Sequence, residues 1–340
     1  MTDFRTVRGF EDVWRPPVRI AAKRPEYRPP ASSPAALRDR LQRVVRRPPE
    51  VMVKVTGRTR DPAHLAAHLT YITRNGDLPA EDREGQPLSG QREVLDVARD
   101  WSAAAMLDSR RRANSPLSVG LVLSMPAGTD AIRLRNAARA FAHNEFADRF
   151  EYVLVLHTDT AHPHVHVSLR AFGDSGERLA IKKADLEVWR QAFAQALRDH
   201  GIEAEATPRR ARGVTRKAER TPMRKLRERA ERREGPPGRI HRAALTAAGR
   251  RAFGAADEER PWEAAISRQQ ARVRATYLAQ ARLLQSSPIA GDRELGRAVE
   301  TFVRSMPAPD TQSLLLARRL REANRQLAGT ERQGPEKDRS

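Results

Sequence analysis

Four of the nine histidines of this chain fall within ten residues, in the segment HTDTAHPHVHVSLR at positions 157–170. The stretch HVHVSLRAF alternates polar and apolar residues, and EYVLVLH precedes it, so we expect two strands joined by the turn TDTAHP. Successive side chains of a strand point to opposite faces, which places His164 and His166 on one face and Val165 and Val167 on the other. A pair of neighbouring imidazoles follows from this alternation alone.

The preceding strand ends at His157, on the face that its alternate valines share. If the two strands form a hairpin, His157 lies across from the start of the second strand, and three imidazoles meet beside Asp159 in the turn. Three neutral imidazoles suit a transition metal and leave positions open for substrate oxygens; histidines that are hydrogen-bonded or face solvent are the alternative. His162 precedes Pro163 and breaks the alternation, so we expect a turn residue there and not a ligand.

The charge of the chain predicts a polyanionic partner. The 340 residues include 63 Lys and Arg against 43 Asp and Glu, a net charge of +20. Nucleic acid is the leading candidate. An acidic membrane surface fits the charge equally well, but the sequence has no apolar run near the roughly 20 residues that span a bilayer, and its N-terminus lacks the apolar core of a secretory signal. The absence of cysteine excludes disulfides, thiolate zinc sites and cysteine nucleophiles, and it fits a reducing cytoplasm.

Composition divides the chain into three parts. Residues 1–50 mix Pro-rich pieces with Arg and Lys, which predicts a largely disordered basic arm. Residues 51–213 alternate short strands with amphipathic helices, which predicts an α+β domain with a central, largely antiparallel sheet flanked by helices. Residues 214–340 are predicted to form a basic, mostly helical and partly disordered C-terminal region. Its charged helices are expected to be solvated or to form a surface for DNA or a partner.

Turn and cap residues place the elements of the middle part. VMVKVT is expected to be a strand that ends at Gly57, and Asp61 and Pro62 start a helix that Asn75 and Gly76 terminate. Further helices are expected over about 91–107, from Asp130 to about Phe146, and up to Gly201 with Leu186, Trp189, Phe193 and Leu197 on one face, with further strands at SVGLVLSMP and around RLAIK.

A metal in a basic protein is suited to polarising a phosphodiester, and such a site needs a nucleophile. On the expected helix, His64, His68 and Tyr71 follow i, i+4, i+7 spacing and form a polar stripe. The residues alone leave Tyr71 open between a nucleophile and a half-buried aromatic anchor. Of the four tyrosines, Tyr27, Tyr71, Tyr152 and Tyr277, only Tyr71 is expected on a capped helix inside the folded domain.

These motifs resemble those of the conjugative relaxases, or mobilisation nucleases, of the HUH endonuclease superfamily, which is named for two histidines around one hydrophobic residue. The similarity is to the branch that contains the border-nicking endonuclease of T-DNA transfer. LTYITRNG resembles its first motif, LSMPAGTD its second, HTDTAHPHVH its third, and HGIEAEATPRRARG the end of its domain. The resemblance covers about residues 51–213, with the motifs in the family's order and spacing.

The resemblance implies that Tyr71 attacks a scissile phosphate in single-stranded DNA at an origin of transfer. It implies that His157, His164 and His166 hold a divalent metal, Mg²⁺ or Mn²⁺, and that Asp159 orients His157 or helps to accept the tyrosine proton. The product is then a reversible 5′-phosphotyrosyl link, which allows nicking and rejoining and initiates conjugative transfer or plasmid mobilisation. A cytoplasmic bacterial protein is implied, translocated with the transferred DNA, with relaxosome accessory proteins and a type IV coupling protein as partners and no insertion into a membrane.

One residue departs from the family's pattern. The third motif often ends with an asparagine four residues after the last histidine, where this chain has Arg170. Strand alternation puts Arg170 on the face of His166, and its guanidinium can bind phosphate in place of the amide. Ser124, at a strand end, and Arg74, in the first motif, complete the predicted DNA contacts.

Three alternatives remain. A rolling-circle replication initiator of the same superfamily generally has its tyrosine after the histidine pair, where only Tyr277 is available. A DNA-binding transfer accessory protein that keeps the fold without cutting needs no nucleophile, and replacing Tyr71 by phenylalanine would leave it unchanged. A metallohydrolase needs no tyrosine either and leaves no protein attached to DNA. A helicase is not expected, because the chain has no GxxxxGK[ST] loop.

Overall fold

The computed structural model describes residues 4–15, 33–216, 219, 221–254 and 260–331. The chain forms two compact units, one of Met1–Phe4 with Pro16–Thr207 and the other of Arg5–Arg15 with Pro208–Ser340. The first unit therefore ends close to the predicted boundary at residue 213, while part of the N-terminal arm belongs to the second unit. The three domain limits expected from composition stay a prediction.

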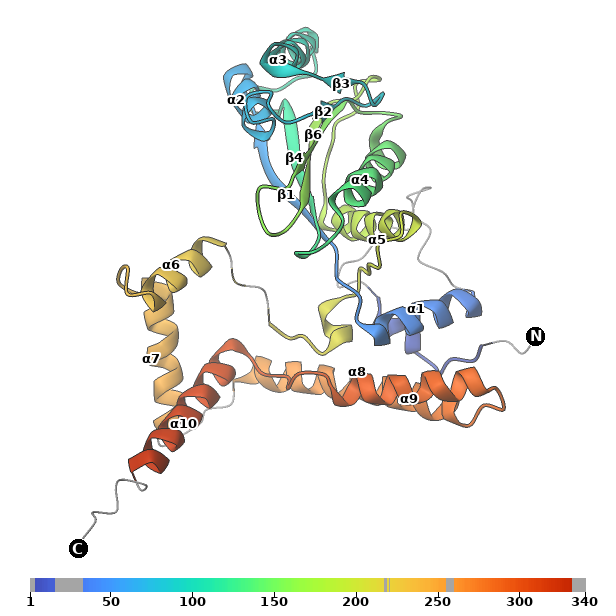
Figure 1. Ribbon diagram of the computed structural model, residues 1–340, viewed down its shortest axis with the longest axis vertical. Helices are drawn as coiled ribbons and strands as arrows, with labels where there is room; N and C mark the ends of the chain where they lie inside the picture. The colour runs from blue at the N-terminus through green and yellow to red at the C-terminus, as the bar shows by residue number, and fades with distance from the viewer. Residues whose placement is uncertain (1–3, 16–32, 217–218, 220, 255–259, 332–340) are drawn as a thin grey trace, which may run out of the picture. The chain divides into compact units, whose positions relative to one another are not determined.

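The first unit is built on one antiparallel sheet (Figure 1). Its described strands have the order β1-β4-β6-β5-β2-β3, and every neighbouring pair is antiparallel. The predicted α+β class with a largely antiparallel sheet is confirmed. The strands are β1 (Met52–Thr59), β4 (Ser118–Ser124), β6 (His164–Arg170), β5 (Tyr152–His157), β2 (Ala80–Glu81) and β3 (Pro87–Leu88).

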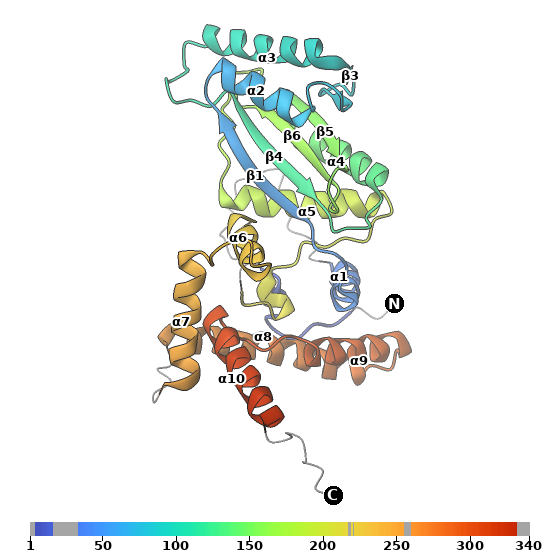
Figure 2. The same ribbon diagram turned by 60° about the vertical axis from the view of Figure 1, so that its left-hand side comes forward.

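Helices cover both faces of this sheet (Figure 2). On one face α4 (Ala131–Phe146) and α5 (Lys183–Asp199) bury the larger core. On the other face α2 (Pro62–Ile72) and α3 (Gly90–Leu107) bury a second core. Polar groups that are fully buried between the sheet and a helix therefore need a hydrogen-bond partner there.

The two cores show which way the histidines point. Val165 and Val167 of β6 pack in the core under α4 and α5, whereas Val153 and Val155 of β5 pack in the core under α2 and α3. The histidines of β6 alternate with its valines, so they face the side of α2 and α3. The alternation predicted for these strands is confirmed.

Helix α2 begins and ends as its sequence predicts. The side chain of Asp61 accepts a hydrogen bond of 2.8 Å from the backbone N–H of His64, and Pro62 occupies the first turn. After Thr73 the chain turns through Arg74, Asn75 and Gly76, all with positive φ. Only glycine fits the last position, because a Cβ on Gly76 would lie 2.3 Å from the backbone nitrogen of Gln91.

Two predicted strand limits were wrong. Strand β1 does not end at Gly57 but continues to Thr59, because a β-bulge between Val55 and Gly57 absorbs one residue and pairing with β4 resumes. The segment RLAIK forms no strand; it contributes an isolated bridge from Arg178 to Phe172 before α5 starts at Lys183. The short β2–β3 hairpin was not expected, since two-residue strands have no periodicity to detect.

Part of the arm over residues 1–50 is helical, where the sequence predicted disorder. Ser33 caps helix α1 (Pro34–Arg46), and Leu37, Leu41 and Val44 are buried. The apolar positions of this helix outweigh the neighbouring prolines, one of which only starts its first turn. Residues 16–32, which carry much of the Pro-rich sequence, lie outside the described residues.

The second unit is helical, as predicted for the C-terminal region. Helices α8 and α9 pack as a hairpin whose buried residues include Tyr277 and Phe302, so these helices have a core of their own. The helices are η1 (Phe10–Val13), η2 (Arg209–Arg212), α6 (Thr221–Glu231), α7 (Arg239–Phe253), α8 (Pro261–Gln285), α9 (Ala290–Arg304) and α10 (Gln312–Glu331). None of the helices within the described ranges has the length and apolar character needed to cross a membrane.

Candidate active site

The register of the β5–β6 hairpin brings the three histidines together. His157 is paired directly with His164, and His166 is paired with Val155 two residues along. The ring centroid of His157 lies 5.1 Å from that of His164 and 4.6 Å from that of His166. The centroids of His164 and His166 are 5.2 Å apart. One nitrogen from each ring lies within 4.8 Å of the others, so the set can hold one metal ion.

Backbone carbonyls assign the nitrogens of two of these rings. The Nε2 atom of His157 lies 2.6 Å from the carbonyl oxygen of Ile72, and the Nδ1 atom of His164 lies 3.0 Å from that of His162. A carbonyl only accepts, so each of these nitrogens carries the proton. The lone pairs then sit on Nδ1 of His157 and Nε2 of His164, as a metal ligand set requires.

Burial favours the neutral form of two of these histidines, His157 and His166. Desolvation is the largest cause that lowers the pKa of His157, whose side chain is almost fully buried. Desolvation also lowers the pKa of His166 to about 3, with smaller contributions from the neighbouring histidines. Neutral imidazoles are the form that binds metal, so His157 and His166 are ready to coordinate at neutral pH.

Tyr71 occupies the last turn of α2 and is 64% exposed, so it is no buried anchor. The guanidinium of Arg74 lies 5.2 Å from the centroid of its ring and makes an ion pair with Asp159. Hydrogen bonds to Asp159 and then to Tyr71 raise the pKa of Arg74, and the hydrogen bond from Arg74 lowers the pKa of Asp159. Asp159 also lies 3.7 Å from Nδ1 of His157, so the ion pair beside the tyrosine is next to the histidine cluster.

The other tyrosines within the described residues are buried. Tyr152 is 2% exposed, and burial raises its pKa to about 12. Tyr277 is fully buried, and its hydroxyl accepts a hydrogen bond of 2.8 Å from the indole of Trp14 within the second unit. Tyr27 lies outside the described residues. A tyrosine nucleophile must reach a phosphate, and among those described Tyr71 has the exposure to do so.

The predicted DNA contacts fall in three different settings. Arg74 lies beside Tyr71. Ser124 is paired with His164 across the sheet, but its hydroxyl is buried and bonds to the carbonyls of Met125 and Pro163. Arg170 is at the far end of β6, roughly 13 Å along the strand from His166 at about 3.3 Å per residue. Its guanidinium pairs with Asp174 and lies over the ring of Phe172, so the structure does not bring Arg170 to the histidines.

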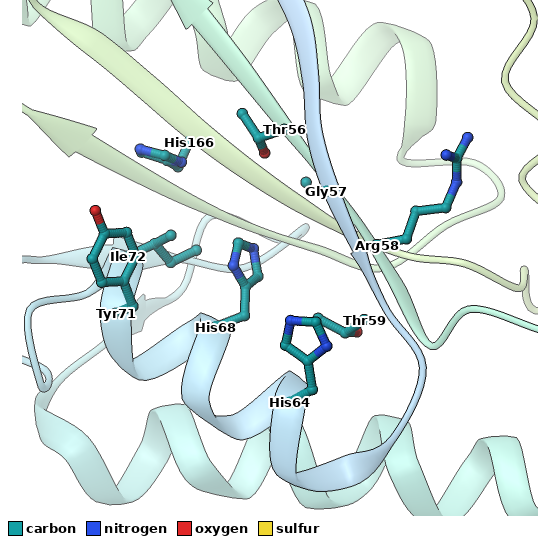
Figure 3. A pocket seen from close by; sticks show the side chains of 10 residues that line it. Thr56, Gly57, Arg58, Thr59, His64, His68, Tyr71, Ile72 and His166 are labelled. Atoms are coloured by element: carbon teal, nitrogen blue, oxygen red, sulfur yellow. The ribbon is translucent and has the colours of Figure 1, made fainter. Parts of the chain in front are cut away.

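A pocket of about 250 Å³ lies beside the tyrosine (Figure 3). Helix α2 lines it with His64, His68 and Tyr71, and β6 contributes His166. The helical spacing of the first three residues predicted that they share a face. The sequence did not predict that β1 and β4 also line the pocket. They contribute Thr56, Gly57, Arg58, Thr59 and Gly120.

Two backbone groups of the site were also missed. The carbonyls of Ile72 and His162 orient ring nitrogens of the histidines, although neither residue was expected to act at the site. For His162 the expectation of a turn residue holds, because its side chain is exposed and lies outside the cluster. A sequence pattern carries no signal for a carbonyl whose role depends on how a helix packs on a sheet.

Part of this chain is similar to known proteins. Residues 71–202 match the model of the relaxase family, MobA/VirD2-like, nuclease domain. The chain is 26% identical over 184 residues to the T-DNA border endonuclease VirD2 of Rhizobium radiobacter, which covers 48% of this chain and 43% of the relative. It is 25% identical over 187 residues to the VirD2 of Agrobacterium fabrum, which covers 49% and 41%. The chain thus spans less than half the length of these curated relatives.

A solved structure is also similar. It is described as the molecular basis of vancomycin resistance transfer in Staphylococcus aureus, and it aligns with 47% of this chain and 99% of its own at 13% identity and a TM-score of 0.33. So low a score carries no argument.

Proposed function

We propose that this chain, which carries a MobA/VirD2-like relaxase nuclease domain over residues 71–202, cuts and rejoins single-stranded DNA at an origin of transfer. Tyr71 is the nucleophile in this proposal. The observation that carries it is the hydrogen bond from His157 to the carbonyl of Ile72, because it fixes the end of the tyrosine helix against the histidine cluster. An exposed phenol and three convergent imidazoles are then neighbours on one face of the sheet.

The reaction exchanges one phosphoester for another. The phenolic oxygen of Tyr71 attacks the scissile phosphorus, the bond from phosphorus to the 3′ oxygen breaks, and the phenolic proton leaves as the departing oxygen gains one. A free phenol has a pKa of about 10, so the attack needs a base or a cation nearby. Arg74 stabilises negative charge on the phenolic oxygen, while Asp159 positions Arg74 and is the nearby carboxylate for the proton. The new ester keeps the bond energy, so the 3′ hydroxyl can attack back.

His157, His164 and His166 would hold the divalent metal, which we propose to be Mg²⁺ or Mn²⁺. The fit rests on the two assigned lone pairs and on the close approach of the three rings. An ion there would neutralise charge on the non-bridging oxygens of the phosphate. Ser124 and Arg170 stay predictions as DNA contacts, since their polar groups already have protein partners.

The charge of the chain supports the remaining part of the proposal. A net charge of +20 suits a protein that binds along a DNA backbone. The logarithm of the affinity for single-stranded DNA should then fall with the logarithm of the salt concentration, with a slope of about 0.7 per phosphate contacted. We propose that the protein acts in the bacterial cytoplasm and that the helical second unit engages DNA, relaxosome accessory proteins or a type IV coupling protein. Burial of Tyr277 disfavours the replication initiator, because its downstream tyrosine is enclosed.

A pool of single-stranded oligonucleotides with a randomised centre tests the proposal without a known target. The protein is incubated with the pool and Mn²⁺, denatured, and DNA that remains attached is recovered after protease digestion and sequenced. We expect one enriched sequence cut at one position, and no attached DNA with Tyr71→Phe or with chelator. Cleavage without attached protein would indicate a metallohydrolase, and binding without cleavage would indicate the accessory protein.

A further inference from the structure

We propose that the pocket beside Tyr71 binds the base of a nucleotide that flanks the scissile phosphate, and that His68 and Thr56 supply its polar contacts. The inference rests on the proposed cleavage reaction and adds a determinant of which DNA sequence is cut. In Figure 3 the side chains of Tyr71, His68, Thr56 and His166 lie around one space. A base held there would be next to both the nucleophile and the histidine cluster.

The pocket exists because of a β-bulge. Val55 is paired with Leu121 and Gly57 with Gly120, so Thr56 is the extra residue of β1 and has no partner across the sheet. A bulge redirects the side chain of its extra residue. Bulges are frequent next to active sites, and the bulge residue Thr56 lines the same pocket as Tyr71.

A glycine in the adjacent strand keeps the space open. A Cβ at Gly120 would lie 2.7 Å from Oγ1 of Thr56 and 3.3 Å from Nε2 of His68. The two polar atoms therefore converge on the volume that a larger residue would fill. Gly57 adds to the opening, because a Cβ built there would meet nothing within 4 Å.

His68 is half-buried, and its ring has no hydrogen-bond partner among the residues that the structure describes. Its ring nitrogens are not among the fully buried unpaired atoms of the described residues, so they are open to solvent and a ligand can bind them in place of water. A neutral imidazole offers one donor and one acceptor, and the hydroxyl of Thr56 offers both. This combination matches the edge of a nucleobase, which presents donors and acceptors side by side.

The lining favours a base over a phosphate group. The rings of Tyr71, His64 and His68 provide flat surface for stacking. The one lysine or arginine of the lining, Arg58, extends away from Tyr71 and His166 (Figure 3). At about 250 Å³ the pocket is smaller than the roughly 300–1,000 Å³ of sites for drug-sized ligands, which limits the occupant to a single base.

The test uses the cleaved oligonucleotide recovered from the random pool. Two further probes carry an abasic site, one on the 5′ side of the cut and one on the 3′ side. Covalent adduct formation is timed for each probe under single-turnover conditions. We expect the wild type to react about tenfold more slowly with one abasic probe than with the intact one, as the loss of a stacked base predicts.

The variants assign this preference to the pocket. Two variants, His68→Ala and Thr56→Val, are expected to reduce the tenfold preference for the intact probe to less than about threefold. Valine keeps the shape of the threonine. The control His143→Ala, on α4 at the opposite face of the sheet, is expected to keep the preference. If one pocket variant fails to fold, judged by its melting temperature, the other decides. Equal rates for intact and abasic probes, or full preference in folded pocket variants, would overturn the inference alone. No adduct from the wild type with any probe would overturn the proposed cleavage itself.

Discussion

The Nε2 atom of His157 lies 2.6 Å from the carbonyl oxygen of Ile72, the residue that follows Tyr71 in the chain. Both side chains are almost completely buried, so this bond is shielded from water. It fixes the proton on Nε2, leaves Nδ1 available to a metal, and holds the last turn of α2 against the strand that ends at His157. One contact thus couples the position of the proposed nucleophile, Tyr71, to the histidine cluster.

Loss of that bond should weaken the fold even without metal. His157→Ala leaves the buried carbonyl of Ile72 unpaired, and we expect the free energy of unfolding to fall by about 1–3 kcal/mol. His164→Ala is the matched control, because its ring is only half-buried and bonds the carbonyl of an exposed residue. Urea denaturation in chelator measures both. Equal losses in the two variants would contradict the role given to the bond.

The ion pair of Arg74 with Asp159 should act as a unit with Tyr71. Arg74→Ala and Asp159→Ala are each expected to slow adduct formation about tenfold or more, and the double variant should be little slower than either single one. Arg99→Ala in α3 removes a comparable exposed ion pair with Asp96 and should leave the rate unchanged. If the rate reduction of the double variant equalled the product of the two single reductions, the two residues would act independently.

The turn after α2 depends on glycine. Gly76 has a φ of +88°, and a Cβ there would meet the backbone of Gly90 and Gln91 at 2.3 Å. Gly76→Ala is therefore expected to cost more than about 1 kcal/mol of stability, while Gly85→Ala, also at positive φ but with open space around it, isolates the cost of the backbone angle. Thermal unfolding of both variants separates the two effects. A Gly76→Ala protein as stable as Gly85→Ala would show that the backbone moves freely there.

Tyr152 gives the protein a sensitivity to high pH. Burial raises its pKa to about 12, above the value near 10 of an unfolded chain. The unfolded state releases this proton first, so stability is lost as the pH rises from about 10 to 12. Between pH 9 and pH 11, the free energy of unfolding measured in urea should fall by roughly 1 kcal/mol less in Tyr152→Phe than in the wild type. The variant should form the DNA adduct normally. Identical pH profiles would mean that Tyr152 ionises freely in the fold.

Much of the site follows from local patterns in the sequence. Alternation in HVHVSLR placed His164 and His166 on one face, and the short turn before them predicted the hairpin that adds His157. The caps of α2 predicted where Tyr71 would lie on its helix. These features depend on neighbours in the chain, so periodicity and turn chemistry are sufficient to find them.

The features that the sequence did not reveal depend on contacts between distant segments. Nothing local marks Thr56 as a bulge residue, because the register of β1 is set by its pairing with β4. Strand alternation assigned Arg170 to the face of His166, but it could not show that Arg170 lies too far along the strand to reach the histidines. The burial of Tyr277 follows from the packing of α8 on α9 and η1, which the scattered apolar residues of that region did not predict.

We propose that Tyr71 is the residue joined to DNA, and mass spectrometry of the adduct identifies that residue. The adduct is trimmed with a nuclease and digested with trypsin, which releases residues 61–74 as one peptide with Tyr71 as its single tyrosine. We expect this peptide to carry the mass of a 5′-phosphorylated deoxynucleotide on Tyr71. The same mass on a peptide that contains Tyr27, Tyr152 or Tyr277, with an unmodified 61–74 peptide, would contradict it.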